Sequence, residues 1–567
     1  MAEYLSPGVY VEEYDSSPRP IEGVGTSTAG FVGLAVKGPA VGAPSLITSF
    51  AEYQRQFGGY LSPYTHGGYR FLPYSVEQFF INGGTRCYVS RVIPVDAKCA
   101  TAKQGILSLS AANAGKWGNR ITAAFVSTNK RKMQLLSAES DQIFTVKSAV
   151  GFSEGDIVEF ASEYNRITSI FENTVTFEKA FASSPVDDAL VPKTVIYSVE
   201  MDVILRCDAE AEVYSSVSLN PTSPDYIAKR LGSSALVTLA LADKKAGAPD
   251  NPVTALFGEE QVKGTVSFAG GTDGTVESVD AGVFIGVDHG PGNRTGIESF
   301  KENSVASIIA VPGITIPEVI VSLVAHCENE KNRFAVLDVP QDLTKTDDVI
   351  KYRGIIDSTY AAVYHPWVQV YDRLAQKTSF IPPSGAVMGI YARTDVSRGV
   401  HKAPANETVS CTGLSTNYTT GEQDILNPVG VNLIRALPGQ GIRVWGARTA
   451  SSNSAFKYVN VRRLFIFVEE SIRAATNWVV FEPNNSSLWT RVQLTISSFL
   501  DGLFRSGMLA GDDAGQAFFV DIGPGTMSQD DILNGRLICN IGIAPVRPAE
   551  FVIFRVTQFT AEAGGGE

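Results

Sequence analysis

The chain lacks the sequence features of secreted, membrane-spanning and disulfide-bonded proteins. Its 567 residues contain no run of 18 apolar side chains, and the N-terminus shows no basic segment followed by an apolar one. The sequence therefore predicts neither a membrane span nor a signal peptide. Its six cysteines are scattered without a C-x-x-C pair, which favours buried, reduced thiols over a disulfide framework.

Positive charge and metal-ligand clusters are also scarce. The formal net charge is −12, whereas a nucleic-acid partner requires a basic excess or patch, so neither DNA nor RNA is expected. The five histidines lie far apart and form no H-E-x-x-H motif, which predicts no metal site. No segment matches G-x-x-x-x-G-K-[ST], so nucleotide hydrolysis is not expected. We expect no cofactor.

Two glycine-rich segments resemble functional loops but lack the required context. Residues 151–155 fit G-x-S-x-G, yet strand-like segments flank them on both sides. A nucleophile elbow needs a strand followed by a helix, so a hairpin turn is the better interpretation. Residues 290–296 lack the lysine of a phosphate-binding loop and indicate a surface turn. The sequence therefore predicts no catalytic residue.

The length exceeds what one hydrophobic core usually supports, so several domains are expected. Strand and helix patterns alternate in 26–100 and again in 263–440, which predicts a sheet covered by helices and an α/β multidomain protein. The expected parts are a linking arm at 1–25, a discontinuous α/β core at 26–100 and 263–440, a β-rich outward insertion at 101–262, an α+β C-terminal domain at 441–560 with a strand at 550–559, and a flexible tail at 561–567.

Local patterns predict individual elements within these parts. In the core they predict strands at 29–35, 304–312, 333–338 and 361–364 and helices at 317–329 and 347–358. In the insertion they predict short strands at 144–146, 156–160, 166–170, 174–177 and 199–207, typical of a small sandwich or barrel. In the C-terminal domain they predict two helices with one apolar face each, the first capped by Asn460 and the second preceded by Asn485.

Both ends of the chain predict strands that have no neighbour in sequence to pair with. A lone strand is not stable in water, so each must join a sheet elsewhere. If each copy lends a strand to the next, the contact is heterologous and generates a ring or a filament. The predicted linking residues are Val9, Tyr10, Val11, Phe551, Val552, Ile553, Phe554 and Val556, and residues 16–25 are expected to be a flexible linker.

Motifs near both ends resemble those of contractile tail sheath proteins, the family of phage tails and phage-like injection systems. They lie at 4–13 (YLSPGVYVEE), 437–449 (LPGQGIRVWGART), 481–484 (FEPN) and 548–554 (PAEFVIF). Two motif sets at opposite ends, in the family's order, are stronger than either alone. The middle of the chain matches the family poorly.

This resemblance implies a structural protein and not an enzyme. Sheath subunits form stacked hexameric rings, a helical homo-oligomer around an inner tube, with baseplate and tail terminator or cap proteins as further partners. Contraction drives the tube through a target envelope, without direct membrane insertion by the sheath. The resemblance also implies assembly in the bacterial cytoplasm, release by lysis, a C-terminal domain that faces the tube and an insertion on the outside.

The resemblance leaves the tube-facing residues and two other functions open. Candidate contacts to the tube are Arg462, Arg463, Arg473, Arg491 and Arg505, on or near the two C-terminal helices. They could instead form local pairs, such as Glu469 with Arg473 at i,i+4. The alternative functions are a hydrolase with an unrecognised site in the α/β core and another tail component, either tube or baseplate.

Overall fold

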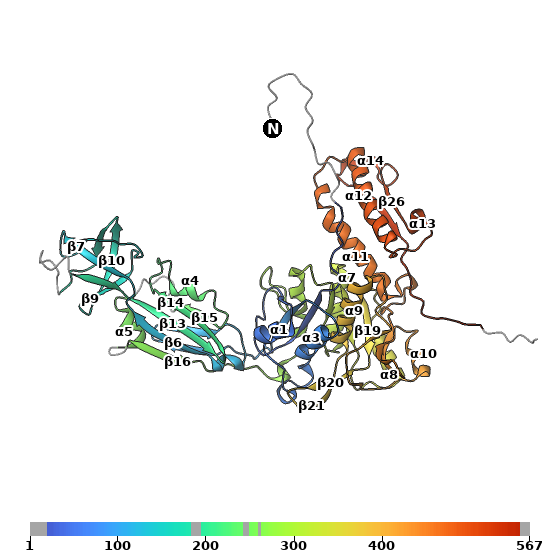
Figure 1. Ribbon diagram of the computed structural model, residues 1–567, viewed down its shortest axis with the longest axis horizontal. Helices are drawn as coiled ribbons and strands as arrows, with labels where there is room; N and C mark the ends of the chain where they lie inside the picture. The colour runs from blue at the N-terminus through green and yellow to red at the C-terminus, as the bar shows by residue number, and fades with distance from the viewer. Residues whose placement is uncertain (1–19, 183–193, 242–248, 259–261, 556–567) are drawn as a thin grey trace, which may run out of the picture.

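The computed structural model describes residues 20–182, 194–241, 249–258 and 262–555 (Figure 1). A sheet covered by helices forms the centre of the molecule, a β-rich insertion extends from one side of it, and a helical C-terminal unit stands on it. Separate hydrophobic clusters fill the core, the insertion and the C-terminal unit. The chain is therefore a multidomain protein of mixed helix and strand.

A nine-stranded sheet organises the core. Its order is β2 (Ser45–Ile47), β3 (Cys87–Val92), β1 (Ala29–Leu34), β17 (Ile308–Ala310), β18 (Phe334–Asp338), β19 (Ala361–His365), β24 (Val431–Leu437), β25 (Gly441–Val444) and β22 (Glu407–Thr408). Strands β3 to β24 run parallel, and the pairs β2–β3, β24–β25 and β25–β22 are antiparallel. Parallel strands are covered on both faces, which explains why β1 and β18 are apolar and buried throughout. The strands predicted at 29–35, 333–338 and 361–364 are confirmed.

Helices cover both faces of this sheet. One face carries α1 (Phe50–Phe57), α3 (Leu72–Ile81) and α9 (Ser384–Arg398), and the other carries α6 (Ala281–Ile285), α7 (Pro317–Glu330), α8 (Thr346–Arg353) and α10 (Thr420–Leu426). A small sheet of β21 (Lys377–Ile381), β20 (Val368–Asp372) and β23 (Gly413–Leu414) packs with the helices of the first face. The short helix α2 (Pro63–His66) lies between α1 and α3 in the chain.

Two predicted core elements are shorter than expected. The helix predicted at 347–358 ends at Arg353, where Gly354, a residue that disfavours helix continuation, forms the C-cap. The strand predicted at 304–312 is reduced to β17, three residues that pair with β1 and β18. The helix predicted at 317–329 is confirmed as α7.

The insertion contains two β structures, each with its own core. Near the core, two sheets pack on each other. The first has the order β14 (Glu210–Val217), β13 (Glu200–Cys207), β6 (Thr122–Thr128) and β16 (Lys263–Ser267). The second has the order β15 (Val237–Leu241), β5 (Leu107–Ala111) and β4 (Thr101–Gln104). Further out lies a closed barrel with its own hydrophobic cluster. Its strand order is β10 (Glu163–Phe171), β11 (Thr174–Phe177), β8 (Ile143–Val146), β7 (Lys132–Ala138), β12 (Val195–Ser198) and β9 (Ile157–Phe160). Two short helices, α4 (Ile227–Leu231) and α5 (Pro252–Phe257), complete the inner part. All five strands predicted in this region are present.

Strand pairing moves two of the expected boundaries. β16 lies beyond residue 262, yet it pairs with β6 and so belongs to the insertion. The neck of the insertion is formed by bridges between Lys98 and Thr272 and between Thr101 and Ala269. β25 begins at Gly441, yet it pairs with β24 in the core sheet. Both errors have one cause, because local patterns identify a strand and do not identify its partner.

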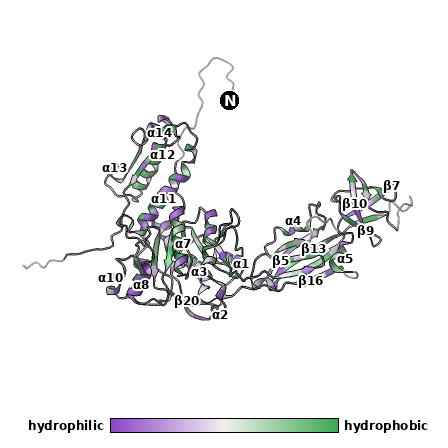
Figure 2. Ribbon diagram, turned by 180° about the vertical axis from the view of Figure 1, so that it is seen from behind, coloured by the Kyte–Doolittle hydropathy of each residue, from purple (hydrophilic) through white to green (hydrophobic). Residues whose placement is uncertain are grey.

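The C-terminal unit consists of two helices that pack against a two-stranded sheet. Its main elements are α11 (Val459–Ala475), α12 (Ser486–Arg505), β26 (Phe518–Ile522) and β27 (Cys539–Ile543), with short helices α13 (Ala514–Ala517) and α14 (Gln529–Leu533). Figure 2 shows hydrophobic and hydrophilic bands along α11, as expected of an amphipathic helix. Asn485, predicted to precede the second helix, caps α12. Asn460 does not cap α11: it is buried within the first turn and donates to the carbonyl of His401 at 2.7 Å.

The segment before β1 is docked on the C-terminal unit. Ile21 is buried in the hydrophobic cluster of α11 and α12, and the N–H of Val24 donates to Ser471 Oγ at 3.1 Å. Thr26 Oγ1 donates to Asp395 on α9 at 2.7 Å, and Arg463 on α11 binds the same carboxylate. Residues 20–25 are therefore fixed on the fold, which corrects the expected flexible linker at 16–25; residues 1–19 lie outside the described residues.

Candidate assembly surfaces

The segment at 551–555 exposes consecutive apolar side chains and makes no strand. The exposed fractions are 71% for Phe551, 68% for Val552, 78% for Ile553 and 86% for Phe554. The strand predicted at 550–559 is thus absent from the described residues of the single chain, as expected when a strand has no partner. Val556 and the N-terminal candidates Val9, Tyr10 and Val11 lie outside the described residues. We call residues 551–559 the C-terminal arm.

Glu550 holds the root of this arm to the body. Arg448 donates from Nε and an Nη nitrogen to the two carboxylate oxygens at 2.7 Å each. Asn427 Nδ2 donates at 2.7 Å, and the Tyr458 hydroxyl donates at 2.9 Å. Burial by itself would raise the pKa of Glu550, but hydrogen bonds from these residues outweigh it and lower the pKa. We call Asn427, Arg448 and Tyr458 the Glu550 socket.

The socket joins two motifs that lie far apart in the sequence. Arg448 belongs to the segment 437–449, and Glu550 belongs to the segment 548–554. Sequence reasoning gave neither residue a role. A signal was present, because the first motif contains two arginines and the second a glutamate, each among uncharged neighbours. Their pairing fixes the point where the arm leaves the fold.

The sheet of the C-terminal unit has only two strands in the described chain, and no described strand extends it beyond β27. β26 packs on α12. Beside the open edge of β27, a cleft of about 320 Å³ is lined by Phe465, Val468 and Ile472 of α11 and by Ile541 and Ile543. A two-stranded sheet is marginal by itself, and an open edge accepts a further strand. The cleft provides an apolar surface for the side chains of such a strand.

The structure separates the five predicted tube-facing arginines into two groups. Arg462 and Arg463 are 7% and 3% exposed. The guanidinium of Arg462 lies over the rings of Phe456 and Tyr360, and Arg463 pairs with buried Asp395. Both side chains therefore make contacts inside the fold, and the prediction that they contact the tube is wrong.

The other three arginines lie on the surface in local contacts. Arg473 pairs with Glu470 rather than with the predicted Glu469, and Arg505 pairs with Asp501. Arg491 lies over the Trp478 ring. Exposed contacts of this kind are weak, so all three remain candidates for an external partner.

The tip of the C-terminal unit presents an aromatic side chain in a strained conformation. Phe481 has a φ of 69° and is fully exposed. Val480 precedes it, and Leu533 of α14 is 77% exposed. The loop is fixed in place, because Asn484 donates to the carbonyl of Arg536 at 2.9 Å and accepts from Trp489 at 2.6 Å. A bulky residue with positive φ that is held outward suggests a function for the tip.

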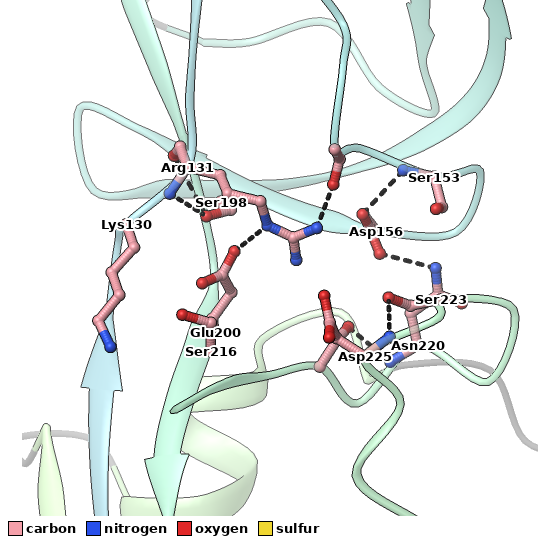
Figure 3. Close-up of polar contacts among 12 residues, drawn as sticks. Lys130, Arg131, Ser153, Asp156, Ser198, Glu200, Ser216, Asn220, Ser223 and Asp225 are labelled. Carbon is pink, nitrogen blue, oxygen red and sulfur yellow. Dashed lines mark hydrogen bonds and ion pairs between the residues drawn. The ribbon is translucent and has the colours of Figure 1, made fainter. Parts of the chain in front are cut away.

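A buried polar cluster joins the barrel to the inner part of the insertion (Figure 3). Arg131, just before β7 of the barrel, pairs with buried Glu200 at the start of β13 of the inner sheet. This ion pair links the two segments that connect the barrel to the sheet. Asp156 accepts from Asn220 Nδ2 at 2.8 Å and from the N–H of Ser153 at 2.9 Å. Residues 151–155 form a turn between β8 and β9, and β9 rather than a helix follows it. The predicted hairpin is wrong, because β8 pairs with β7 and β11 whereas β9 pairs with β10 and β12. The cluster fixes the barrel in position and supplies no hydrolase geometry.

Metal and membrane features are absent from the part of the chain that the structure describes. Across those ranges, no group of three or more His, Cys, Asp or Glu side chains is placed to hold a metal ion. No described helix combines the length and apolar character that crossing a bilayer requires. The candidate assembly surfaces are therefore the C-terminal arm, the Glu550 socket, the two-stranded sheet β26–β27 with its cleft, and the tip of the C-terminal unit.

Comparisons with known proteins agree with the motifs. Residues 290–450 match the phage tail sheath protein central domain, and residues 451–559 match the phage tail sheath C-terminal domain. A putative prophage major tail sheath protein of Pseudomonas aeruginosa (strain UCBPP-PA14) is 25% identical over 289 residues, 49% of this chain and 72% of that protein. The tail sheath protein of Escherichia phage P2 is 25% identical over 382 residues, 64% of this chain and 91% of that protein. The contracted sheath complex of the PVC extracellular contractile injection system shares the fold, with a TM-score of 0.53 and 22% identity over 99% of this chain and 100% of that one.

Proposed function

We infer that this chain, which belongs to the phage tail sheath family, polymerises as stacked hexameric rings around an inner tube and contracts to drive that tube through a target cell envelope. It is a tail sheath protein of a phage or a phage-like contractile injection system. We propose that it acts without catalysis, is assembled in the bacterial cytoplasm and is released by lysis. Its further partners are the baseplate and the tail terminator or cap.

The observation that carries this proposal is the C-terminal arm. Its root is held by a bidentate ion pair, while its four apolar side chains beyond the root are exposed. Apolar residues that are held in position and left uncovered mark an interface that the single chain has not formed. The open hairpin β26–β27 of the neighbouring copy, with its apolar cleft, is the proposed acceptor for a strand.

Negative-stain microscopy of the expressed protein tests this function. The full chain should form striated hollow cylinders, and a variant without residues 1–19 should lose them. The deletion stops at residue 19 because residues 20–25 are docked on α11. A monodisperse full-length protein with a hydrolytic activity that survives the deletion would favour the hydrolase. Isolated rings or plates without cylinders would favour a tube or baseplate component.

We propose that the tip of the C-terminal unit faces the tube. Val480, Phe481 and Leu533 would supply apolar contact, and Arg473, Arg491 and Arg505 would supply weak charged contacts. Weak contacts suit a surface that must release the tube when the sheath expands. The strained, exposed Phe481 is the sharpest test of this orientation, because the single chain gains nothing from its side chain.

Replacing Phe481 with glycine should weaken attachment to the tube without weakening the fold. Glycine adopts a positive φ freely, so the free energy of unfolding should stay the same or rise by about 1 kcal/mol. Thermal unfolding measures the change in stability. Co-sedimentation of the sheath with its tube protein measures attachment and should fall. The exposed Phe171→Ala of the barrel is the control. Unchanged co-sedimentation would contradict the proposed orientation.

We propose that the insertion lies outside the cylinder and is dispensable for assembly. Its two hydrophobic clusters are distinct from those of the core, and paired segments at 98–101 and 269–272 form its neck. Near the neck, Val36 packs on both parts, and Arg91 of the core donates to the carbonyl of Ala114 at 2.8 Å. The bridge between Lys98 and Thr272 brings the chain ends together there, so a short glycine linker can replace everything between them.

Removing the insertion through that linker should leave cylinder formation unchanged by electron microscopy. A second variant removes the barrel alone by joining Arg131 to Ser198, whose backbone groups bond at 2.9 Å. This variant keeps the inner sheets and their core, so it remains informative if the larger deletion is insoluble. Soluble monomers that fail to polymerise in the barrel deletion would contradict the proposal.

A further inference from the structure

A basic groove lies where the C-terminal unit meets the core. It has a volume of about 920 Å³, and residues 544–547 lead into it directly from the end of β27. The residues that line it include five cationic side chains and two carboxylates. The cations are Arg398, Lys402, Arg435, Arg448 and Arg547, and the carboxylates are Asp424 and Glu550.

Most of the positive charge in the groove is unpaired. Glu550 is already bound by Arg448. Within the described part of the chain, Arg398, Arg435 and Arg547 form no ion pair with a carboxylate. Arg435 donates to the neutral side chain of Gln423, and its buried Nε has no hydrogen-bond partner among those residues. In a chain with a net charge of −12, such a cluster indicates an acidic partner.

The chain itself contains an acidic segment outside the described residues. Residues 1–18 carry Glu3, Glu12, Glu13 and Asp15 and no lysine or arginine. Three of these carboxylates fall within four positions, directly after the predicted strand residues Val9 and Val11. A strand added parallel to β27 would carry these residues toward the groove, because the groove begins where β27 ends.

The docked segment 20–26 and the groove lie toward opposite ends of α11, which favours a second copy as the source of the occupant. Thr26 lies beside Arg463 in the first half of α11, and Val24 lies beside Ser471 in the second half. From residue 26 to residue 24 the chain therefore runs toward the far end of α11. The groove lies at the opposite end, where Asn460 of the first turn bonds the groove residue His401.

We propose that the basic groove binds the acidic segment 12–15 of a neighbouring copy and thereby fixes the order in which copies add to the polymer. This inference rests on the proposed function as a polymer. Charge attraction speeds encounter and rejects wrong pairings, while the strand ladder holds the joined copies. Assembly should accordingly slow as the salt concentration rises.

A charge exchange between two variants tests the proposal. The groove variant carries Arg398→Glu and Arg547→Glu at two exposed positions, and the arm variant carries Glu12→Lys and Glu13→Lys. Each variant by itself should polymerise roughly tenfold more slowly or worse, by light scattering and microscopy. An equimolar mixture should recover cylinders that contain both variants, because each arm then meets a groove of opposite charge. Lys132→Glu with Lys263→Glu in the insertion makes the same change in net charge as the groove variant and should have no effect.

The possible outcomes distinguish a failure of this inference from a failure of the proposed sheath function. A groove variant that polymerises like the wild type would overturn the groove and leave the sheath function intact. Recovery in one chain that carries all four changes, without recovery in the mixture, would place the contact within a single copy and overturn the second-copy occupant. Recovery of the groove variant by Glu562→Lys with Glu567→Lys would assign the groove to the C-terminal tail and overturn the proposed segment. A wild type without cylinders would contradict the proposed function, and the inference falls with it.

Discussion

Proline at Ile553 is expected to abolish polymerisation while leaving the fold of the single chain unchanged. The side chain is 78% exposed and lies in no strand of the described chain, so the substitution removes no intramolecular contact. In the polymer the same residue would lie in an intermolecular ladder. Proline removes one donor and is disfavoured within a sheet, so the ladder should fail there. Thermal unfolding should match the wild type, and microscopy should show no cylinders.

The alternation of a strand requires more than one position to be tested. One of two adjacent residues faces the ladder with its N–H and the other faces away, so Val552, Val556 and Val11 should also be changed to proline. Ala563→Pro, beyond the predicted strand, is the matched control and should polymerise normally. If all four proline variants still form extended, contractile sheaths, the terminal strands do not connect the subunits.

Breaking the Glu550 socket is expected to have the second largest effect, because it releases the root of the arm. Glu550→Ala leaves Arg448, whose side chain is 7% exposed, without its carboxylate. Loss of a hydrogen-bonded charged partner costs about 1–3 kcal/mol, partly recovered where the freed arm lets water reach the arginine. Polymerisation should fall more steeply than stability, because an arm without a fixed root explores many directions and pays ordering entropy on binding.

A double-mutant cycle with Arg448→Ala isolates this pair. If the two side chains act through each other, the double variant should cost little more than either single variant. Acid should reproduce the effect, because the pKa of Glu550 is lowered in the fold. The pair's contribution is then present above the unfolded pKa of about 4.3 and is lost as the pH falls through the lower folded value. Arg505→Ala, which removes an exposed pair with Asp501, is the control. Additive losses in the cycle would show that the socket is not the connection we infer.

Local features of the sequence were sufficient for the elements whose cause is local. Ala29–Leu34 reads as an apolar run because a parallel strand is buried on both faces. Asn485 begins α12 because its side chain accepts from the N–H of Leu488, three residues away. The exposed arm at 551–554 could be predicted because four consecutive apolar residues near the end of a chain need a partner.

Tertiary structure decided everything that depends on a distant partner. Asn460 has the chemistry of a cap, yet it lies within the first turn of α11 and bonds the carbonyl of His401. Arg462 and Arg463 have the chemistry of surface residues, yet aromatic rings and Asp395 enclose them. Glu550 meets Arg448 across 102 residues of sequence. A sequence records the chemical capacity of each side chain, but which capacity is used depends on what the fold brings within a few ångströms.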